Sequence, residues 1–93
     1  FVHTTNFPYG KIIATSHMYD PRMRRIAITF DSLPHTIFVF DFSPTRFNFF
    51  GRKDYDAGVG SWVTGVEIAQ NKLFVVLEYA KRVEIFDLDD IRE

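Results

Sequence analysis

The sequence predicts an all-β chain in which one antiparallel sheet unit occurs twice. Segments rich in β-branched and aromatic residues alternate with turn-forming Pro, Asn and Asp. No long stretch has the apolar periodicity and the caps of a helix. Short patterns also return at a nearly constant spacing, because Asp41 and Asp87 stand 46 residues apart and Ile26 and Leu73 stand 47 apart.

The repeated unit is a pair of neighbouring strands. Residues 26–31 (IAITFD) correspond to 73–78 (LFVVLE), and residues 37–42 (IFVFDF) correspond to 83–88 (VEIFDL). The one-residue difference in spacing falls in the turn that joins the strands, where insertions are tolerated. A period of about 40 to 50 residues is typical of the four-stranded blades of a β-propeller. We therefore expect two four-stranded antiparallel blades, residues 1–48 and 49–93, that form part of a six-bladed ring.

The strands can be assigned in order along the chain from residue type. The first blade is predicted to have strands at residues 11–17, 25–31, 36–42 and 47–51. The second is predicted to have strands at residues 61–69, 72–79 and 82–88, with its outer strand missing from the C-terminus. Turns are predicted at Asp20-Pro21, Leu33-Pro34, Ser43-Pro44 and Asn71-Lys72.

The two ends of the chain fall in the middle of blades. Residues 1–3 are expected to be the outer strand of a preceding blade or to close a ring, and residues 89–93 are compatible with a short helical turn. Because the chain starts at Phe1 without an initiator Met, we expect it to be processed, excised or part of a longer protein, and the ends within blades favour the longer protein.

Composition excludes several classes of protein. The 93 residues carry a net charge of −1 and are 46% hydrophobic, which argues against disorder and lacks the basic excess of nucleic-acid binders. Nucleic acid is therefore an unlikely partner. There is no cysteine, so disulfides, zinc–thiolate sites and thiol nucleophiles are excluded. No apolar stretch approaches the ~20 residues that span a bilayer. The compartment stays open between the cytoplasm and the bacterial envelope.

A pattern of glycines, aromatic residues and strand residues runs through positions 49–88. It comprises Phe50-Gly51, Gly58, Gly60, Trp62, Gly65-Val66-Glu67-Ile68, Asn71, Leu73-Phe74-Val75, Glu78 and Arg82-Val83-Glu84-Ile85-Phe86-Asp87-Leu88. This pattern resembles an NHL repeat, the blade unit of mostly six-bladed propellers. The first blade matches less well, since Thr36 stands where the repeat has Arg. These departures leave the first blade also similar to the blades of TolB-like propellers, which are common in bacterial envelope proteins. The resemblance implies a fold more than a function.

One face of such a propeller gathers the loops between blades and the loops between the second and third strands. On this face we expect a site for a protein, peptide or glycan, because aromatic rings give contact area and charged groups give orientation. For Tyr9 and Trp62, packing within the blades is an equal alternative. The candidate binding residues are Tyr9, His35, Arg52, Asp54, Tyr55, Trp62, Tyr79 and Arg82.

Other candidate sites have weaker patterns. The histidines lack metal-ligand spacing, and no cofactor or metal is predicted. Asp54-Tyr55-Asp56 lacks the Gly and Glu of a calcium loop. The basic cluster at residues 22–25 is interpreted as a solvated turn more readily than as a phosphate contact. We also expect Arg82 to pair with Glu78.

The leading functional hypothesis is a non-catalytic propeller module that binds a partner. Propellers related to NHL repeats also include lactonases and a metal-dependent lyase, so a part of such an enzyme is an alternative, with His17 and Glu67 as its candidate residues. A third possibility is a two-blade, lectin-like chain that completes a ring as a trimer. Further blades would then come from the same chain or from other copies.

Overall fold

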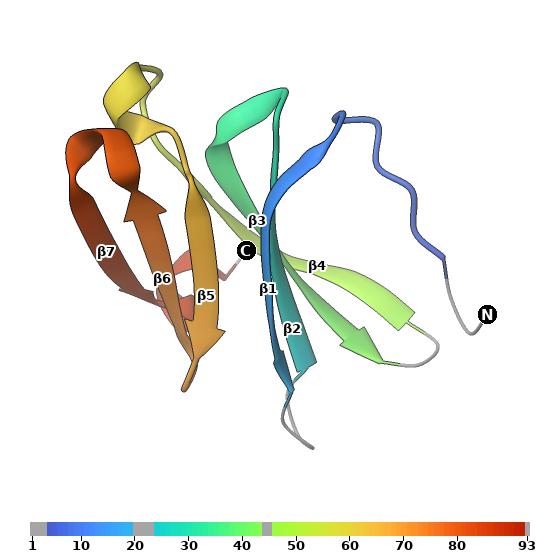
Figure 1. Ribbon diagram of the computed structural model, residues 1–93. Helices are drawn as coiled ribbons and strands as arrows, with labels where there is room; N and C mark the ends of the chain where they lie inside the picture. Colours follow the sequence, from blue (N-terminus) through green and yellow to red (C-terminus); the bar gives the residue numbers. More distant parts are fainter. Residues whose placement is uncertain (1–3, 20–23, 44–45, 93) are drawn as a thin grey trace.

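The computed structural model describes residues 4–19, 24–43 and 46–92, which form two antiparallel sheets (Figure 1). The first sheet has the order β1-β2-β3-β4 and consists of β1 (Ile12–Tyr19), β2 (Arg24–Phe30), β3 (Leu33–Ser43) and β4 (Arg46–Asp54). The second has the order β5-β6-β7 and consists of β5 (Gly65–Ala69), β6 (Lys72–Leu77) and β7 (Arg82–Asp87). Short 3-10 turns are η1 (Val59–Ser61), η2 (Glu78–Ala80) and η3 (Leu88–Ile91).

The predicted all-β class is confirmed, and several predicted boundaries need correction. The second sheet has three strands in the described chain, as expected for a blade whose outer strand is missing. Its first strand begins at Gly65, because the residues before it form η1 and a loop that bonds to both sheets. The division expected after residue 48 falls inside β4, which pairs with β3 as far as Asp54. The expected strand at residues 1–3 lies outside the described residues.

Tight turns join the neighbouring strands. Gln70 and Asn71 have φ angles of 53° and 61° and connect β5 to β6, as a two-residue hairpin turn of type I′ requires. The turn between β2 and β3 is formed by residues 31–32, since Phe30 pairs with Leu33. Leu33 and Pro34 therefore belong to β3, contrary to the predicted turn. Pro34 is tolerated there because it lies where the β2–β3 register shifts.

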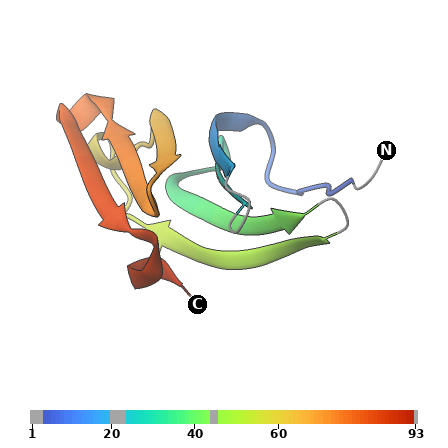
Figure 2. The same cartoon turned by 90° about the horizontal axis from the view of Figure 1, so that it is seen from below.

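The main core lies between the two sheets, where β5 packs against β1 and β2 (Figures 1 and 2). We call the sides that meet the contact faces. The contact face of the first sheet carries Ala27, Ile37 and Val39, and that of the second carries Val66, Ile68, Leu73, Val75 and Leu77. A bulge in β4, opposite Val39 and Phe40, turns Phe50 into the same core.

The opposite side of the first sheet, which we call the aromatic face, forms a second apolar cluster. Ile28, Phe30 and Phe38 are buried there, and the segment that leads into β1 covers them. Phe7 lies 5.2 Å from the Phe30 ring, and Tyr9 stacks on Phe38 at 5.6 Å. The opposite side of the second sheet, which we call the outer face, has no such cover over the described residues.

The two sheets face the same way. Leu73, on the contact face of the second sheet, corresponds in the repeat to Ile26, which packs on the aromatic face of the first. The contact faces of the two sheets are therefore opposite sides of the repeated strand pair. A cross-strand ion pair also recurs at the same position, as Arg25–Asp41 at 2.8 Å in the first sheet and as Lys72–Asp87 in the second.

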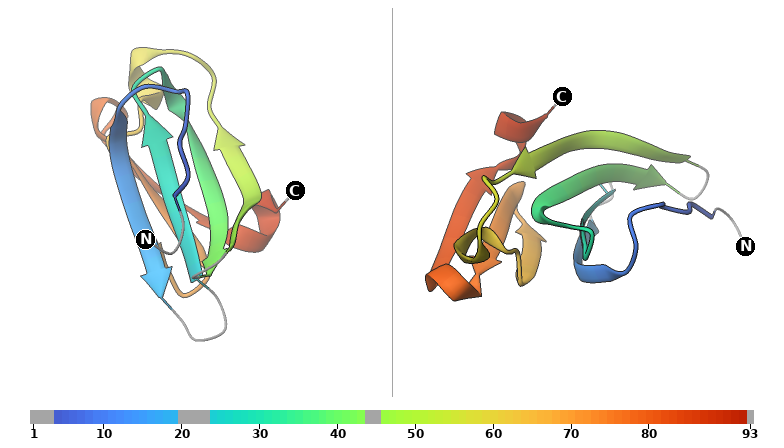
Figure 3. Two further views of the ribbon diagram at one scale, coloured as in Figure 1. Left: turned by 90° about the vertical axis from the view of Figure 1, so that its right-hand side faces the viewer. Right: turned by 90° about the horizontal axis from the view of Figure 1, so that it is seen from above.

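The C-terminal turn lies against the outermost strand of the first sheet (Figure 3). Arg92 forms an isolated antiparallel bridge with Gly51 of β4. A Cβ atom at position 51 would overlap the carbonyl oxygen of Ile91, so this contact requires glycine. Leu88 of η3 is fully buried in the main core. The helical turn expected near the C-terminus is confirmed as η3.

Candidate functional site

The structure separates the predicted binding residues into three groups. Most of them lie at or beyond the strand ends where β3 begins and β4 ends, whereas Arg52 lies within β4, opposite Phe38 in the middle of β3. The first group is aromatic and the second is charged, whereas Tyr9 stands alone on the aromatic face. The groups are His35, Trp62 and Tyr79; then Arg52, Asp54, Tyr55 and Arg82; and finally Tyr9.

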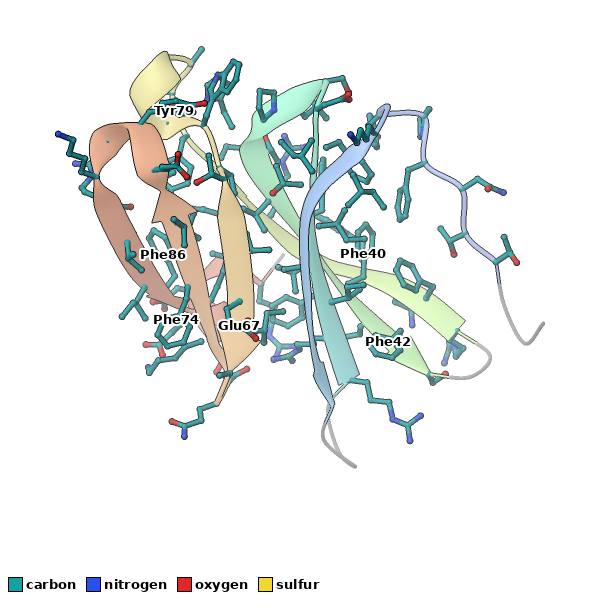
Figure 4. The ribbon with its side chains drawn as sticks, viewed as in Figure 1. Phe40, Phe42, Glu67, Phe74, Tyr79 and Phe86 are labelled. Carbon is teal, nitrogen blue, oxygen red and sulfur yellow. The ribbon has the colours of Figure 1, made fainter. Side chains whose placement is uncertain are left out.

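His35, Trp62 and Tyr79 form a ridge of rings that we call the aromatic end cluster. The ring centroids of His35 and Trp62 are 6.4 Å apart, and those of Trp62 and Tyr79 are 6.0 Å apart with the planes at 86°. Trp62 is 43% exposed and Tyr79 is 56% exposed. Figure 4 shows Tyr79 at the upper end of the second sheet. Aromatic surface on this scale, placed in loops, suits contact with another molecule.

The backbone around the cluster is held by both sheets. The Val63 amide donates to the Pro34 carbonyl at 2.9 Å, and the Thr64 amide donates to the Val76 carbonyl at 3.0 Å. Val63, next to Trp62, is 1% exposed and anchors the loop in the main core. Lys81 adopts a left-handed conformation, with φ of 56°, that closes the turn bearing Tyr79. The exposed rings therefore stand on an ordered base, which lowers the entropy cost of binding.

Ser61 orients the imidazole of His35 within the cluster. His35 Nδ1 lies 3.1 Å from the carbonyl oxygen of Ser61 and 3.0 Å from its hydroxyl. The Ser61 hydroxyl in turn lies within hydrogen-bond distance of the carbonyl oxygens of Asp56 and Gly58, and it donates its single proton to one of them. Sequence reasoning missed Ser61, because its partners are distant along the chain and no local pattern marks them.

The side chains of the charged group form hydrogen bonds with one another and with neighbouring residues of the chain. Arg52 donates to both carboxylate oxygens of Asp54 at 2.9 and 2.8 Å, and the Thr36 hydroxyl donates to the same carboxylate at 2.7 Å. The hydrogen bond from Arg52 lowers the pKa of Asp54 below its usual value. Because Asp54 is engaged in this way, the structure does not assemble the calcium site considered for Asp54 and Asp56.

Tyr55 and Arg82 both contact the carboxylate of Glu84. The Tyr55 hydroxyl donates to Glu84 at 3.1 Å, and Arg82 Nε lies 3.5 Å from the other oxygen of Glu84. Burial, reinforced by the Glu84 charge, raises the pKa of Tyr55. Glu78 was the expected partner of Arg82. Arg82 instead lies beside Glu84, because the two residues are two positions apart on β7 and so share one face of the strand. These contacts mainly stabilise the join between the sheets.

Tyr9 is a packing residue. Its ring lies nearly parallel to Phe38, with the planes 11° apart, and is 5.4 Å from Phe30. The Ser32 hydroxyl donates to its backbone carbonyl. Packing was the alternative explanation for Tyr9 and Trp62, and both rings have ring contacts while they stay partly exposed, Tyr9 by 38% and Trp62 by 43%.

The remaining candidates do not form a chemical site over the described residues. No group of three His, Asp or Glu side chains there could hold a metal ion. Glu67 is exposed on β5, and the side chain of His17 lies outside the described part of the structure. Arg25 does not take part in an exposed basic cluster, because it is 4% exposed and donates to Asp41 and Asn71.

Two further results bear on the identity of the chain. Within the ranges that the structure describes, every helical segment is too short or too polar to cross a bilayer. Comparison with protein-family models, with curated proteins and with solved structures finds no match.

Proposed function

We propose that the chain is a non-catalytic binding module built from two consecutive β-propeller blades, and that its aromatic end cluster contacts a protein or peptide. The observation that carries this proposal is the exposure of Trp62, on a loop that is bonded to each sheet, and of Tyr79, on the turn η2 beside it. Exposed aromatic rings on a rigid base are typical of the residues that dominate protein interfaces.

The arrangement of the strands supports the propeller interpretation. In each sheet, consecutive strands are neighbours, and the first strands of the two sheets pack against each other. The sheets also face the same way, as successive blades around an axis do. An NHL-like or TolB-like ring is the family of propeller that the sequence pattern favours.

A protein or peptide partner is favoured over a glycan by the surroundings of the rings. Exposed charged side chains of both signs, Glu78 and Lys81, flank Tyr79 on the same turn. Rings bordered by polar groups at the rim are the usual composition of a protein interface. The Ser61 hydroxyl is already engaged with a backbone carbonyl and is not available to a sugar.

The test uses Trp62 as its own reporter, because it is the only tryptophan in the chain. Labelled protein is applied to a peptide array and to an oligosaccharide array, and each hit is titrated in solution by tryptophan fluorescence. We expect peptide hits that shift the emission. Tyr79→Ala should weaken them by roughly 10- to 30-fold, which corresponds to about 1.4 to 2 kcal/mol.

A matched control is Ile85→Ala, which removes an aliphatic side chain that is 56% exposed on the outer face, away from the cluster. It should leave peptide affinity unchanged. Folded Tyr79→Ala and Trp62→Ala variants that keep full affinity for every hit would refute the site, with the Trp62 variant measured on the array. Hits confined to oligosaccharides would refute the class of partner.

A further inference from the structure

The atoms around Nδ1 of His35 determine which nitrogen of its ring carries the proton. Nδ1 lies 3.1 Å from the carbonyl oxygen of Ser61 and 3.0 Å from the Ser61 hydroxyl. The carbonyl oxygen only accepts hydrogen bonds, and the single proton of the hydroxyl goes to the carbonyl oxygen of Asp56 or Gly58. Nδ1 therefore carries a proton and donates it. In the neutral imidazole, Nε2 is then an acceptor with a free lone pair.

Nε2 of His35 is open to solvent. His35 is half-buried, and within the described part of the chain its hydrogen bonds are those of Nδ1. Thr29 Oγ1 is the only buried side-chain nitrogen or oxygen without a hydrogen-bond partner among the described residues. Since Nε2 has no partner and is not such a buried atom, a bound group can reach it. The cluster thus offers a hydrogen-bond acceptor beside two exposed rings.

The rings of Trp62 and Tyr79 carry no cation of the chain itself. Elsewhere the chain places its own cations on aromatic rings, as with Arg25, which lies 4.0 Å from the centre of the Phe50 ring. Over the described residues, no such contact involves Trp62 or Tyr79. Tryptophan is the strongest cation–π partner among the aromatic side chains. The two exposed rings are therefore available to a cation from another molecule.

The formal charge of the two segments that carry these rings is negative. Asp56 is the only charged residue in positions 55–64, and η2 with the position after it contains Glu78 and Lys81. All three side chains are exposed. The acceptor, the aromatic rings and the charge together favour a positively charged hydrogen-bond donor.

We propose that the aromatic end cluster binds an arginine side chain of the partner peptide. A guanidinium group is planar, stacks on aromatic rings and holds its N–H donors in its own plane. It can therefore lie on Trp62 and donate to Nε2 of His35, whose ring centroid is 6.4 Å from that of Trp62. The ammonium group of lysine has no plane to stack and is more strongly hydrated. This inference rests on the proposed function, because it specifies the partner of the same site.

The first measurement is the tautomer of His35 in the whole chain without a ligand. Nitrogen-15 NMR of the imidazole, at a pH where the ring is neutral, should show a protonated Nδ1 and an unprotonated Nε2. The signals of His35 are assigned by their loss in His35→Gln. A neutral His35 ring with its proton on Nε2 would overturn the proposal.

The second measurement compares three blocked Gly-Ser peptides that carry one central arginine, lysine or citrulline. Citrulline has the shape of arginine without its charge. Each peptide is titrated against the wild-type chain by Trp62 fluorescence and by the NMR signal of the indole. The arginine peptide should bind roughly 10-fold more tightly than the citrulline peptide, and more tightly than the lysine peptide. An arginine peptide that binds no better than either of the others would overturn the proposal.

Variants of the chain test the acceptor and the charge with the arginine peptide. His35→Phe removes the acceptor and should weaken binding by roughly 5-fold, whereas His35→Gln supplies another acceptor and should keep most of the affinity. Glu78→Gln should weaken binding by about 2-fold. Its matched control, Asp90→Asn, removes an exposed acid from η3 and should leave the affinity unchanged. Circular dichroism confirms that each variant is folded, and a folded His35→Phe with full affinity would contradict the proposal.

The peptide array separates this inference from the proposed function. Each arginine in a hit is replaced by citrulline, and the affinity is measured again. Hits that keep their affinity would refute the arginine site and leave a peptide-binding cluster standing. An array without peptide hits would refute both.

Discussion

The repeated ion pair offers a comparison of one substitution in two environments. Asp41→Asn and Asp87→Asn remove the same charge from the same position of the two sheets. In the first sheet the partner, Arg25, has a side chain that is 5% exposed, whereas the partner Lys72 in the second is 45% exposed. Arg25 also lies over the Phe50 ring at 4.0 Å. Asp41→Asn thus leaves a buried cation without its counter-ion, while Lys72 regains water.

The expected magnitudes follow from this difference in burial. Removing one partner of a fully buried pair costs about 3–5 kcal/mol, but the Asp41 side chain is 45% exposed and an asparagine oxygen can still accept from Arg25. We therefore expect a loss of about 1.5 kcal/mol in the free energy of unfolding for Asp41→Asn. That loss corresponds to a melting temperature lower by roughly 10 °C. For Asp87→Asn we expect less than about 0.5 kcal/mol.

Urea denaturation, followed by circular dichroism and by Trp62 fluorescence, measures both losses at one low protein concentration. The slope of the transition should be the same for both variants, because the surface exposed on unfolding does not change. Equal losses for Asp41→Asn and Asp87→Asn would refute the argument, because the expected difference comes from the burial of Arg25 compared with the exposure of Lys72.

Three further substitutions test the packing. Leu88→Ala should lower the free energy of unfolding by about 3 kcal/mol, whereas Ile85→Ala should change it by less than about 0.5 kcal/mol; similar losses in urea would contradict the assigned core. Tyr55→Phe should cost about 1 kcal/mol at pH 7, since Glu84 loses a donor. Because the Tyr55 pKa is raised, this stabilisation is present below about pH 10 and is lost as the pH rises further. Gly51→Val should displace the C-terminal turn, seen as faster amide exchange there, and unchanged exchange would contradict that contact.

Strand positions could be predicted from the sequence because they depend on local composition. The strands around residues 25–31 and 82–88 were placed within a residue or two of β2 and β7. The start of β5 was misplaced because Trp62, Val63 and Thr64 have strand-like side chains. Their backbone amides and side chains instead hold a loop between the two sheets, which no local pattern reveals.

The candidate site was predictable in its location and less so in its composition. Loop connectivity placed His35, Trp62 and Tyr79 at one end, and the structure brings their rings together. The same reasoning included Tyr9 and Arg52, whose partners are set by packing across strands. The Arg25–Asp41 and Lys72–Asp87 pairs could have been found, because extending the repeat by one residue before Ile26 and Leu73 aligns the two bases.

The central claim is that the two sheets face the same way. The contact face of the first sheet and the contact face of the second are then opposite sides of the repeated strand pair. Methyl-resolved nuclear Overhauser spectroscopy on the wild-type chain tests it most directly. The methyl groups of Val66 and Ile68 should give cross-peaks to those of Ala27 and Val39. Cross-peaks from Val76, on the outer face, to the first sheet would show the opposite packing and contradict the account.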